Sequence, residues 1–334
     1  MTPIEPRLDH LWRLSDDTGL FEHALGAVPR REHGYCVDDA ARGLVVLCRE
    51  RRQALPLIER YLALVVHAQG ADGRFRNRLG YDRRWQDEPG TGDWWGRALW
   101  GLGTAAAKCT AGWVRDRALL GFETGSRHRP DSLRSMAFAA MGAAEILSVR
   151  PEHDTARALL LDASAFIHQA QLDPVWPWPE RRLHYANAVL PETLIAAGQL
   201  LDDSALLTEG EHLLGWLLRT ETRAGYLSLT PSDGWRAGEP RPAFAQQPIE
   251  AAAMADACAR AMGADPNTRW RAGVELAADW FLGKNDLDVP MYDADTGGGY
   301  DGLHADRHNY NQGAESTLAL ISTLQHARRL EERG

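Results

Sequence analysis

Two kinds of apolar segment alternate along the chain. Segments of the first kind are amphipathic: in 204–218 the leucines recur at helical spacing and acidic residues fall on the opposite face. Segments of the second kind, such as 134–147 and 249–262, carry Ala, Met and Gly on most faces. Because small residues let helices approach closely, we expect these to be inner helices, with the amphipathic ones packed outside them.

This alternation predicts six helical hairpins, each with an outer and an inner helix. The expected pairs are 8–24 with 38–51, 55–69 with 93–108, 112–123 with 132–148, 155–172 with 188–200, 204–219 with 247–262, and 267–283 with 312–330. Strand signals are weak, apart from GRFRN and GYLSL. The pattern therefore predicts an all-α fold, an (α/α)6 toroid with an inner and an outer ring. No Pro/Ser-rich linker divides the chain, so we expect a single domain over residues 1–334.

Acidic residues recur where the inner helices are expected to begin. Five starts place a carboxylate in the first turn, and the sixth has Asp131; the five are Asp38/Asp39, Asp93, Glu192, Glu250 and Glu315. A toroid would bring these starts together in one funnel, lined by the long loops that precede the helices. The helix macrodipole also favours acids in a first turn, by about 0.3–1 kcal/mol, so ordinary capping remains an alternative at each site.

Composition limits the possible partners and compartments. The formal net charge is −9 and the basic residues are scattered, which disfavours nucleic acid as a partner. No apolar run is long enough to span a membrane, and the N-terminal residues do not resemble a signal peptide. The four cysteines form no CxxC pair, so we expect reduced thiols and a cytoplasmic protein.

The first junction, HGYCVDDAARG, is the strongest candidate for catalysis. It combines His33, Tyr35, Asp38 and Asp39. Hydrolysis of a glycosidic bond needs one protonated and one ionised carboxyl group beside a sugar ring. Two adjacent acids with different burial can sustain such a difference in pKa.

The other junctions supply aromatic, amide and basic side chains that suit sugar recognition. GTGDWWGRALW places Asp93 before Trp94 and Trp95, of which we expect at most one to stack on a ligand. Asp93, Glu250 and Glu315 are further catalytic candidates. The expected substrate-binding residues at the remaining positions are Arg97, His184, Tyr185, Asn187, Glu192, Gln247, Asn311 and Gln312.

The segment MYDADTGGGYDGLHADRHNYNQG resembles an ion-binding loop only superficially. It lacks the bidentate Glu of an EF-hand and the GK[ST] of a phosphate-binding loop. We interpret it as a loop that lines the funnel, with Tyr300, Asp301 and His304 near the substrate. We expect no metal and no cofactor.

Several of these blocks resemble a known domain. HGYCVDDAARGL, FRNRLGYDRRWQDEPGTGDWWGRALWGLG, YANAVLPE, QQPIEAAAM and WFLGKNDLDVPMYDADTGGGYDGLH…NQGAESTLA are similar to blocks of a bacterial (α/α)6-toroid domain of glycoside-hydrolase type. That domain occurs alone or attached to glycosyltransferases, and the resemblance covers residues 30–325. It implies a carbohydrate-related role and a possible association with a glycosyltransferase.

The adjacent aspartates also resemble the paired Asp motif of toroidal endo-α-1,6-mannanases. That resemblance would make Asp38 and Asp39 the nucleophile and the acid/base. GTGDWWGRALW departs from the pattern in the residues after its Asp, which indicates a different subsite.

The sequence therefore favours a glycoside hydrolase that acts on an oligo- or polysaccharide in the funnel of the toroid. Three alternatives remain open: a sugar epimerase, a polysaccharide lyase, and a non-catalytic glycan-binding module that partners a glycosyltransferase. No His falls in the first turn of an expected inner helix, which counts against the epimerase. Linkage, stereochemical outcome and the identity of the catalytic pair are left open.

Overall fold

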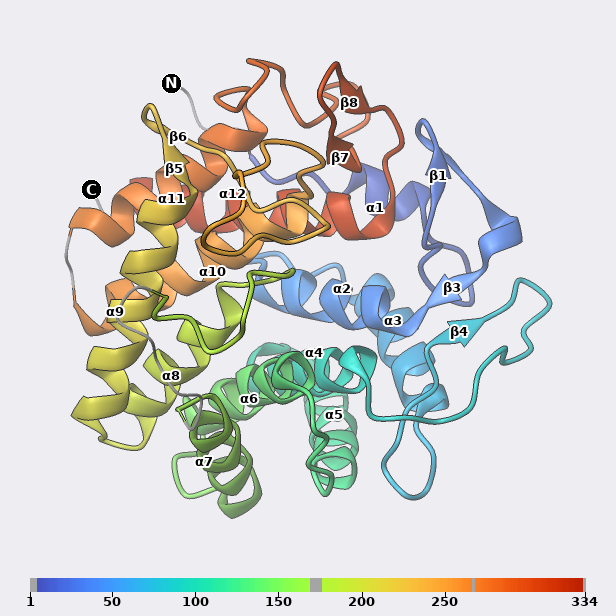
Figure 1. Cartoon of the computed structure of the whole chain (residues 1–334). Coiled ribbons are helices and arrows are strands. Elements are labelled where there is room, and N and C mark those ends of the chain that lie inside the picture. Colours follow the sequence, from blue (N-terminus) through green and yellow to red (C-terminus); the bar gives the residue numbers. More distant parts are fainter. Residues whose placement is uncertain (1–4, 169–175, 266–267, 333–334) are drawn as a thin grey trace.

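Helices make up most of the structure, a computed structural model that describes residues 5–168, 176–265 and 268–332. Six of the twelve helices in these ranges form an inner ring: α2 (Val37–Arg49), α4 (Asp93–Lys108), α6 (Leu133–Leu147), α8 (Val189–Leu200), α10 (Pro248–Ala264) and α12 (Ala314–Glu332). Each inner helix packs on the next, and α12 closes the ring against α2 (Figure 1). The predicted (α/α)6 toroid is confirmed.

The outer helices each pack on an inner neighbour. They are α3 (Leu55–Ala68), α5 (Gly112–Gly125), α7 (Asp154–His168), α9 (Ser204–Glu221) and α11 (Thr268–Phe281), with the short α1 (Asp9–Arg13) near α12. The end of the predicted outer helix 155–172 lies outside the described residues.

Small residues determine how closely the inner helices approach. A Cβ at Gly142 of α6 would overlap the carbonyl oxygen of Leu99 on α4, and a Cβ at Gly103 would overlap Gly142 in turn. Nearly every residue of α6 is buried, and the Ser132 side chain caps its first turn by accepting from the backbone N–H of Ser135. The Ala- and Gly-rich texture of these segments is therefore a packing requirement of the ring.

One sequence prediction about a helix end is wrong. The helix expected over 8–24 ends at Arg13, because the Asp16 carboxylate accepts from the backbone N–H groups of Thr18 and Gly19 and forms a turn. The acid expected at the start of the third inner helix, Asp131, is exposed and precedes the capping Ser132.

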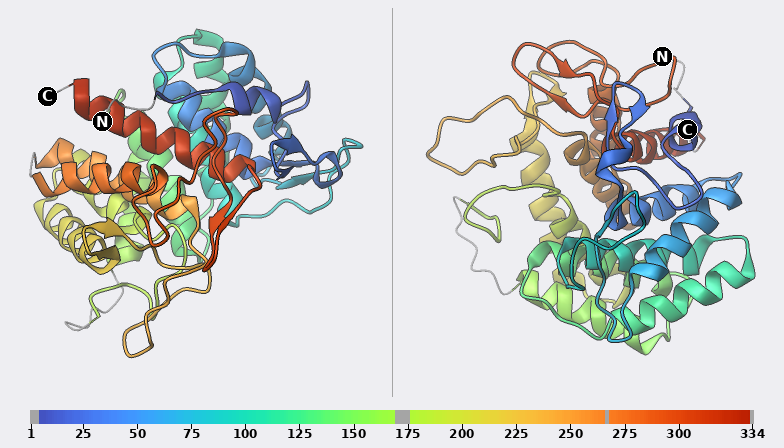
Figure 2. Two further views of the ribbon diagram at one scale, coloured as in Figure 1. Left: turned by 90° about the horizontal axis from the view of Figure 1, so that it is seen from above. Right: turned by 90° about the vertical axis from the view of Figure 1, so that its right-hand side faces the viewer.

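Short hairpins project from the ring. The paired strands are β1 (Ala24–Leu25) with β2 (Val28–Pro29), β3 (Tyr35–Cys36) with β4 (Arg78–Leu79), β5 (Thr222–Arg223) with β6 (Tyr226–Leu227), and β7 (Gly302–Leu303) with β8 (His308–Asn309). The loops that carry them, together with the loop at 228–247, gather on one side of the ring (Figure 2). β6 lies in GYLSL as expected, whereas GRFRN contributes only isolated bridges at Phe75.

Within the described ranges, no helix is both long and apolar enough to cross a membrane.

Candidate active site

A polar pocket opens where the inner helices α2, α10 and α12 begin. Its volume is about 430 Å³. The hairpins and long loops complete its walls, and its lining residues are Glu22, His23, Cys36, Asp38, Asp39, Arg42, Arg78, Ser232, Ala245, Gln246, Gln247, Asp301, Gly302, His304, Asn309, Gly313, Glu315 and Ser316. Six of them are among the predicted site residues: Asp38, Asp39, Gln247, Asp301, His304 and Glu315. We refer to it as the carboxylate pocket.

The Arg42 guanidinium holds three carboxylates at the floor of the carboxylate pocket. Its Nη1 donates to Oδ1 of Asp39, and its Nη2 lies 2.7 Å from Oε2 of Glu315 and 3.6 Å from Oδ2 of Asp38. Arg42 and the two aspartates share the first turns of α2, whereas Glu315 comes from the first turn of α12. Closure of the ring is therefore what brings the third carboxylate to the pair.

The two aspartates differ in environment. The Asp38 side chain is 19% exposed and the Asp39 side chain only 3%. Burial would raise the pKa of Asp38, but the nearby guanidinium groups of Arg42 and Arg97 outweigh it and lower that pKa. Burial, reinforced by the charges of Asp38 and Glu315, raises the pKa of Asp39 well above its usual value despite Arg42. One carboxyl group is thus favoured in the ionised form and its neighbour in the protonated form.

Four further side chains at or beside the pocket are not among the predicted site residues. Arg78 of β4 donates to Glu22, which lies 56 residues earlier in the sequence and just before β1. The Cys36 thiol donates to Oδ1 of Asp38 over 2.6 Å, and Asn77 accepts from the backbone N–H of Asp38. Burial raises the pKa of the Cys36 thiol, so it acts as a hydrogen-bond donor rather than as a thiolate nucleophile.

Glu22, Cys36 and Asp39 are near enough to one another to be considered as metal ligands. One ligand atom of each lies within 4.8 Å of the other two. However, Glu22 is paired with Arg78 and Asp39 with Arg42. The two guanidinium groups already supply the positive charge that a metal ion would bring, so the residues fit a metal poorly.

A second, smaller cavity lies deeper along the axis of the ring. Its volume is about 50 Å³, and it shares two lining residues, Arg42 and Glu315, with the carboxylate pocket. Apart from charged residues and Trp100, its wall is mostly apolar, with Val45, Val46, Phe138, Val189, Ile249, Ala252 and Leu318. We refer to it as the inner cavity. The predicted residues Arg97 and Glu192 line it.

Some predicted site residues form hydrogen bonds within the fold and do not line a cavity. Glu250 accepts hydrogen bonds from the backbone N–H groups of Ala186 and Asn187 and from the Asn187 side chain, and it lines neither cavity. Burial raises its pKa to about 8. Asn187 in turn accepts from Arg134. We therefore leave Glu250 out of the catalytic set and Asn187 out of the substrate-binding set.

The tryptophans expected to grip sugar also have structural partners. Nε1 of Trp94 donates to the Phe75 carbonyl over 2.7 Å, and Nε1 of the fully buried Trp95 donates to the Gly125 carbonyl. Asp93 accepts from the Ser135 hydroxyl of α6. Neither tryptophan lines the carboxylate pocket.

Some of the remaining predicted residues are exposed, and others are packed in the interior. Tyr35 is buried and donates to Asp16, and Gln312 bonds to Asp293 and Thr296. Asn311 accepts from the backbone of Gly26. Four others lie outside the lining of both cavities: His33 and His184 are exposed, whereas Tyr185 and Tyr300 are half-buried. Asp301 lines the pocket but also caps α12 through Gly313 and Ser316.

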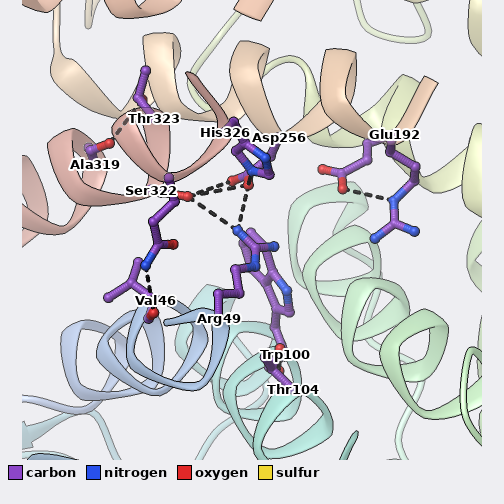
Figure 3. A network of polar contacts seen from close by, with 12 residues as sticks. Val46, Arg49, Trp100, Thr104, Glu192, Asp256, Ala319, Ser322, Thr323 and His326 are labelled. Atoms are coloured by element: carbon purple, nitrogen blue, oxygen red, sulfur yellow. Dashed lines mark hydrogen bonds and ion pairs between the residues drawn. The ribbon is translucent and has the colours of Figure 1, made fainter. Parts of the chain in front are cut away.

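The opposite end of the ring carries a separate buried network of charges (Figure 3). Asp256 accepts from Nη1 of Arg49 over 2.6 Å, and Nε2 of His326 lies 2.6 Å from the same oxygen. Glu192 pairs with Arg260 over 3.0 Å. These groups join α2, α8, α10 and α12, and Glu192 lines the inner cavity but not the carboxylate pocket.

No protein-family model matches the sequence, and no curated protein matches it. Solved structures do match the fold. The cellobiose 2-epimerase of Bacillus thermoamylovorans superposes with a TM-score of 0.71 at 10% identity and covers 96% of both chains. A GH76 α-mannanase of Bacteroides thetaiotaomicron gives 0.66 at 10% identity, over 97% of this chain and 95% of that one. A D-mannose isomerase gives 0.67 at 10% identity, over 96% and 95%.

These neighbours define the class of fold. Each is an enzyme that processes sugars, and the group includes hydrolases, epimerases and isomerases. The chain therefore has the (α/α)6 toroid fold of carbohydrate-active enzymes. At 10% identity the likeness shows the fold alone.

Proposed function

We propose that this protein is a glycoside hydrolase that cleaves an oligo- or polysaccharide in the carboxylate pocket, with Asp38 and Asp39 as the catalytic pair. The observation that carries the proposal is that two adjacent carboxyl groups of different exposure, Asp38 and Asp39, share Arg42 at one polar pocket, an arrangement that lowers the pKa of Asp38 and raises that of Asp39. Glycosidic cleavage needs one carboxylate and one carboxylic acid beside the same sugar ring.

The placement of the pair supports separate roles. Successive residues of a helix point about 100° apart, so the two side chains leave the first turn of α2 in different directions. Arg42 bonds to Oδ1 of Asp39, and we assign the proton to its Oδ2. The more exposed Asp38 carboxylate is the nucleophile in this scheme.

In the first step Asp38 bonds to the anomeric carbon while Asp39 transfers its proton to the departing glycosidic oxygen. In the second step the Asp39 carboxylate takes a proton from water, and the resulting hydroxide attacks the anomeric carbon and releases Asp38. One water is consumed per bond cleaved, and the configuration at the anomeric carbon is retained.

A sugar epimerase or isomerase is the second candidate. His23 and His304 line the carboxylate pocket, and a neutral imidazole can remove a proton beside a carbonyl group. Both lie on loops rather than on inner helices, and both side chains are solvent-accessible. The buried, charge-coupled groups at the floor of the pocket are carboxyls, which favours hydrolysis.

A product assay separates the two reactions. We would incubate the protein with α- and β-linked manno- and gluco-oligosaccharides and with free mannose, glucose and cellobiose, and follow the products by chromatography and proton NMR. A hydrolase releases new reducing ends with retained configuration, whereas an epimerase converts a free sugar without cleaving a bond. Asp38→Asn should abolish release, and Asp93→Asn, an acid outside the pocket, should leave it near the wild-type rate. Conversion of free sugars with no release from any oligosaccharide would overturn the proposal.

A further inference from the structure

The side chain of Arg97 is buried in the inner cavity without the partner that its charge requires. Arg97 is 3% exposed, and neither its Nε nor its Nη2 has a hydrogen-bond partner. Among the described residues no carboxylate lies within 4 Å of its guanidinium nitrogens, although Asp38 and Glu315 are close enough to act on its charge. Its pKa falls only to about 10, through burial and the nearby charge of Arg42, so the group remains a cation at neutral pH.

The orientation of this guanidinium is fixed. It lies 3.8 Å above the centre of the Phe138 ring, which holds its plane. Nε and Nη2 form one edge of the group, and their two N–H bonds point in parallel, which is the fork that binds a carboxylate with two hydrogen bonds. Trp100 lines the same cavity, and its Nε1 is also buried without a partner. Three buried donor atoms without partners therefore belong to residues that line a small, mostly apolar space.

We propose that the inner cavity is the site for the carboxylate of a hexuronic acid, so that the substrate of this protein contains uronic acid residues. The inference rests on the proposed function for the position of the sugar ring, which lies in the carboxylate pocket beside Asp38. From there the carboxylate at C5 reaches past Arg42 and Glu315, which line both cavities, to the free edge of Arg97.

Size and charge favour a carboxylate over other groups. A cavity of about 50 Å³ holds a few water-sized groups but no second sugar ring. A hydroxyl group would leave the charge of Arg97 uncompensated. The inner cavity is also lined by three acids, Glu192, Asp256 and Glu315, and their repulsion is reduced because each is paired with an arginine: Arg260, Arg49 and Arg42 respectively. The apolar wall strengthens the remaining attraction by excluding water.

The test compares binding of matched sugars. We would measure the affinity of glucuronate, galacturonate and mannuronate against glucose, galactose and mannose by calorimetry, with wild type, Arg97→Met and Arg97→Lys. At least one uronate should bind about tenfold or more tightly than its neutral parent. Arg97→Met should lose this preference, and Arg97→Lys should lose most of it, because an ammonium group lacks the fork.

Two controls keep the result interpretable. Arg134→Met removes another buried arginine, one that is paired with Glu180 and lines neither cavity, and it should leave the preference intact while lowering the melting temperature. Arg97→Met removes a buried cation with an unbonded edge, which favours the fold, and also a charge that stabilises the ionised Asp38, which opposes it; a cooperative melting curve establishes that the variant is folded. Equal affinity of wild type for uronates and neutral sugars, or a preference that survives in Arg97→Met, would overturn the inference. Binding is measured without turnover, so the two proposals can fail separately. A preference for uronates without hydrolysis of any glycoside would refute only the proposed function. Hydrolysis of a glycoside without a preference for uronates would refute only this inference.

Discussion

Replacement of Arg42 by Met removes the cation that holds Asp38, Asp39 and Glu315 together. Breaking a buried ion pair by deleting one partner typically costs about 3–5 kcal/mol. The loss should come mainly from the ionised Asp38, because Asp39 is favoured in the protonated form and the Glu315 side chain is 39% exposed and can be solvated. With about 2.1 cal/mol/K of unfolding entropy per residue, 334 residues give about 0.7 kcal/mol/K, so the melting temperature should fall by about 4–7 °C.

The pH dependence of the melting temperature shows whether the lost charge of Arg42 causes the destabilisation. The pKa of Asp38 is depressed in the folded wild type, so Asp38 contributes stability above its unfolded pKa, and this contribution is lost as the pH falls through the folded pKa. Without Arg42, burial raises that pKa, and the ionised group becomes destabilising at neutral pH. The melting difference between wild type and Arg42→Met should therefore be largest near about pH 7 and shrink towards about pH 4.5.

Scanning calorimetry at several pH values measures this directly. Arg78→Met is the matched control: Arg78 pairs with Glu22 but is 45% exposed, so its loss should cost at most about 1 kcal/mol. Adding Asp38→Asn to Arg42→Met should restore part of the stability, because it removes the carboxylate that has lost its cation. A melting difference that does not change with pH would refute the assigned charge states.

Three further predictions concern residues that the structure places outside the carboxylate pocket. Glu250→Ala should lower the free energy of unfolding by about 2–4 kcal/mol, measured by urea denaturation, because two backbone N–H groups in 184–187 lose a buried acceptor. Gly142→Ala should lower the melting temperature by several degrees or prevent folding, since its Cβ would overlap the Leu99 carbonyl oxygen; an unchanged melting curve would mean that α4 and α6 are less closely packed. Trp94→Phe should leave KM for the substrate unchanged in steady-state assays, and a large rise would place that indole at the sugar after all.

The helical ring could be predicted because its signal is local. Ala-rich and amphipathic segments differ in composition, and each difference follows from what surrounds the helix. The first predicted helix fails for a local reason as well: the apolar spacing over 8–24 continues through a turn that Asp16 stabilises. Periodicity alone does not register that interruption.

The site was only partly predictable, because an acid in a first helical turn gives the same sequence signal whether it binds substrate or backbone. Asp39 and Glu250 both begin inner helices, yet one faces the carboxylate pocket and the other anchors a neighbouring loop. Glu22 lies on a hairpin segment where a helix was expected, and its partner Arg78 is 56 residues away. Contacts of that kind depend on the closed fold, and no spacing in the sequence indicates them.

The central claim is that Asp39 donates a proton and that Asp38 attacks the sugar. The most direct measurement is the pH dependence of kcat/KM for a cleaved oligosaccharide and for an aryl glycoside of the same sugar, whose leaving group needs no proton. Wild type should show a bell-shaped profile on the oligosaccharide, with loss of activity at high pH as Asp39 ionises.

In Asp39→Asn the oligosaccharide rate should fall by about 10²–10⁴-fold, whereas the aryl glycoside should be cleaved far faster than the oligosaccharide and without the high-pH loss. Asp38→Asn should abolish cleavage of both substrates. An Asp39→Asn protein that cleaves the oligosaccharide at the wild-type rate, with an unchanged pH profile, would contradict the account.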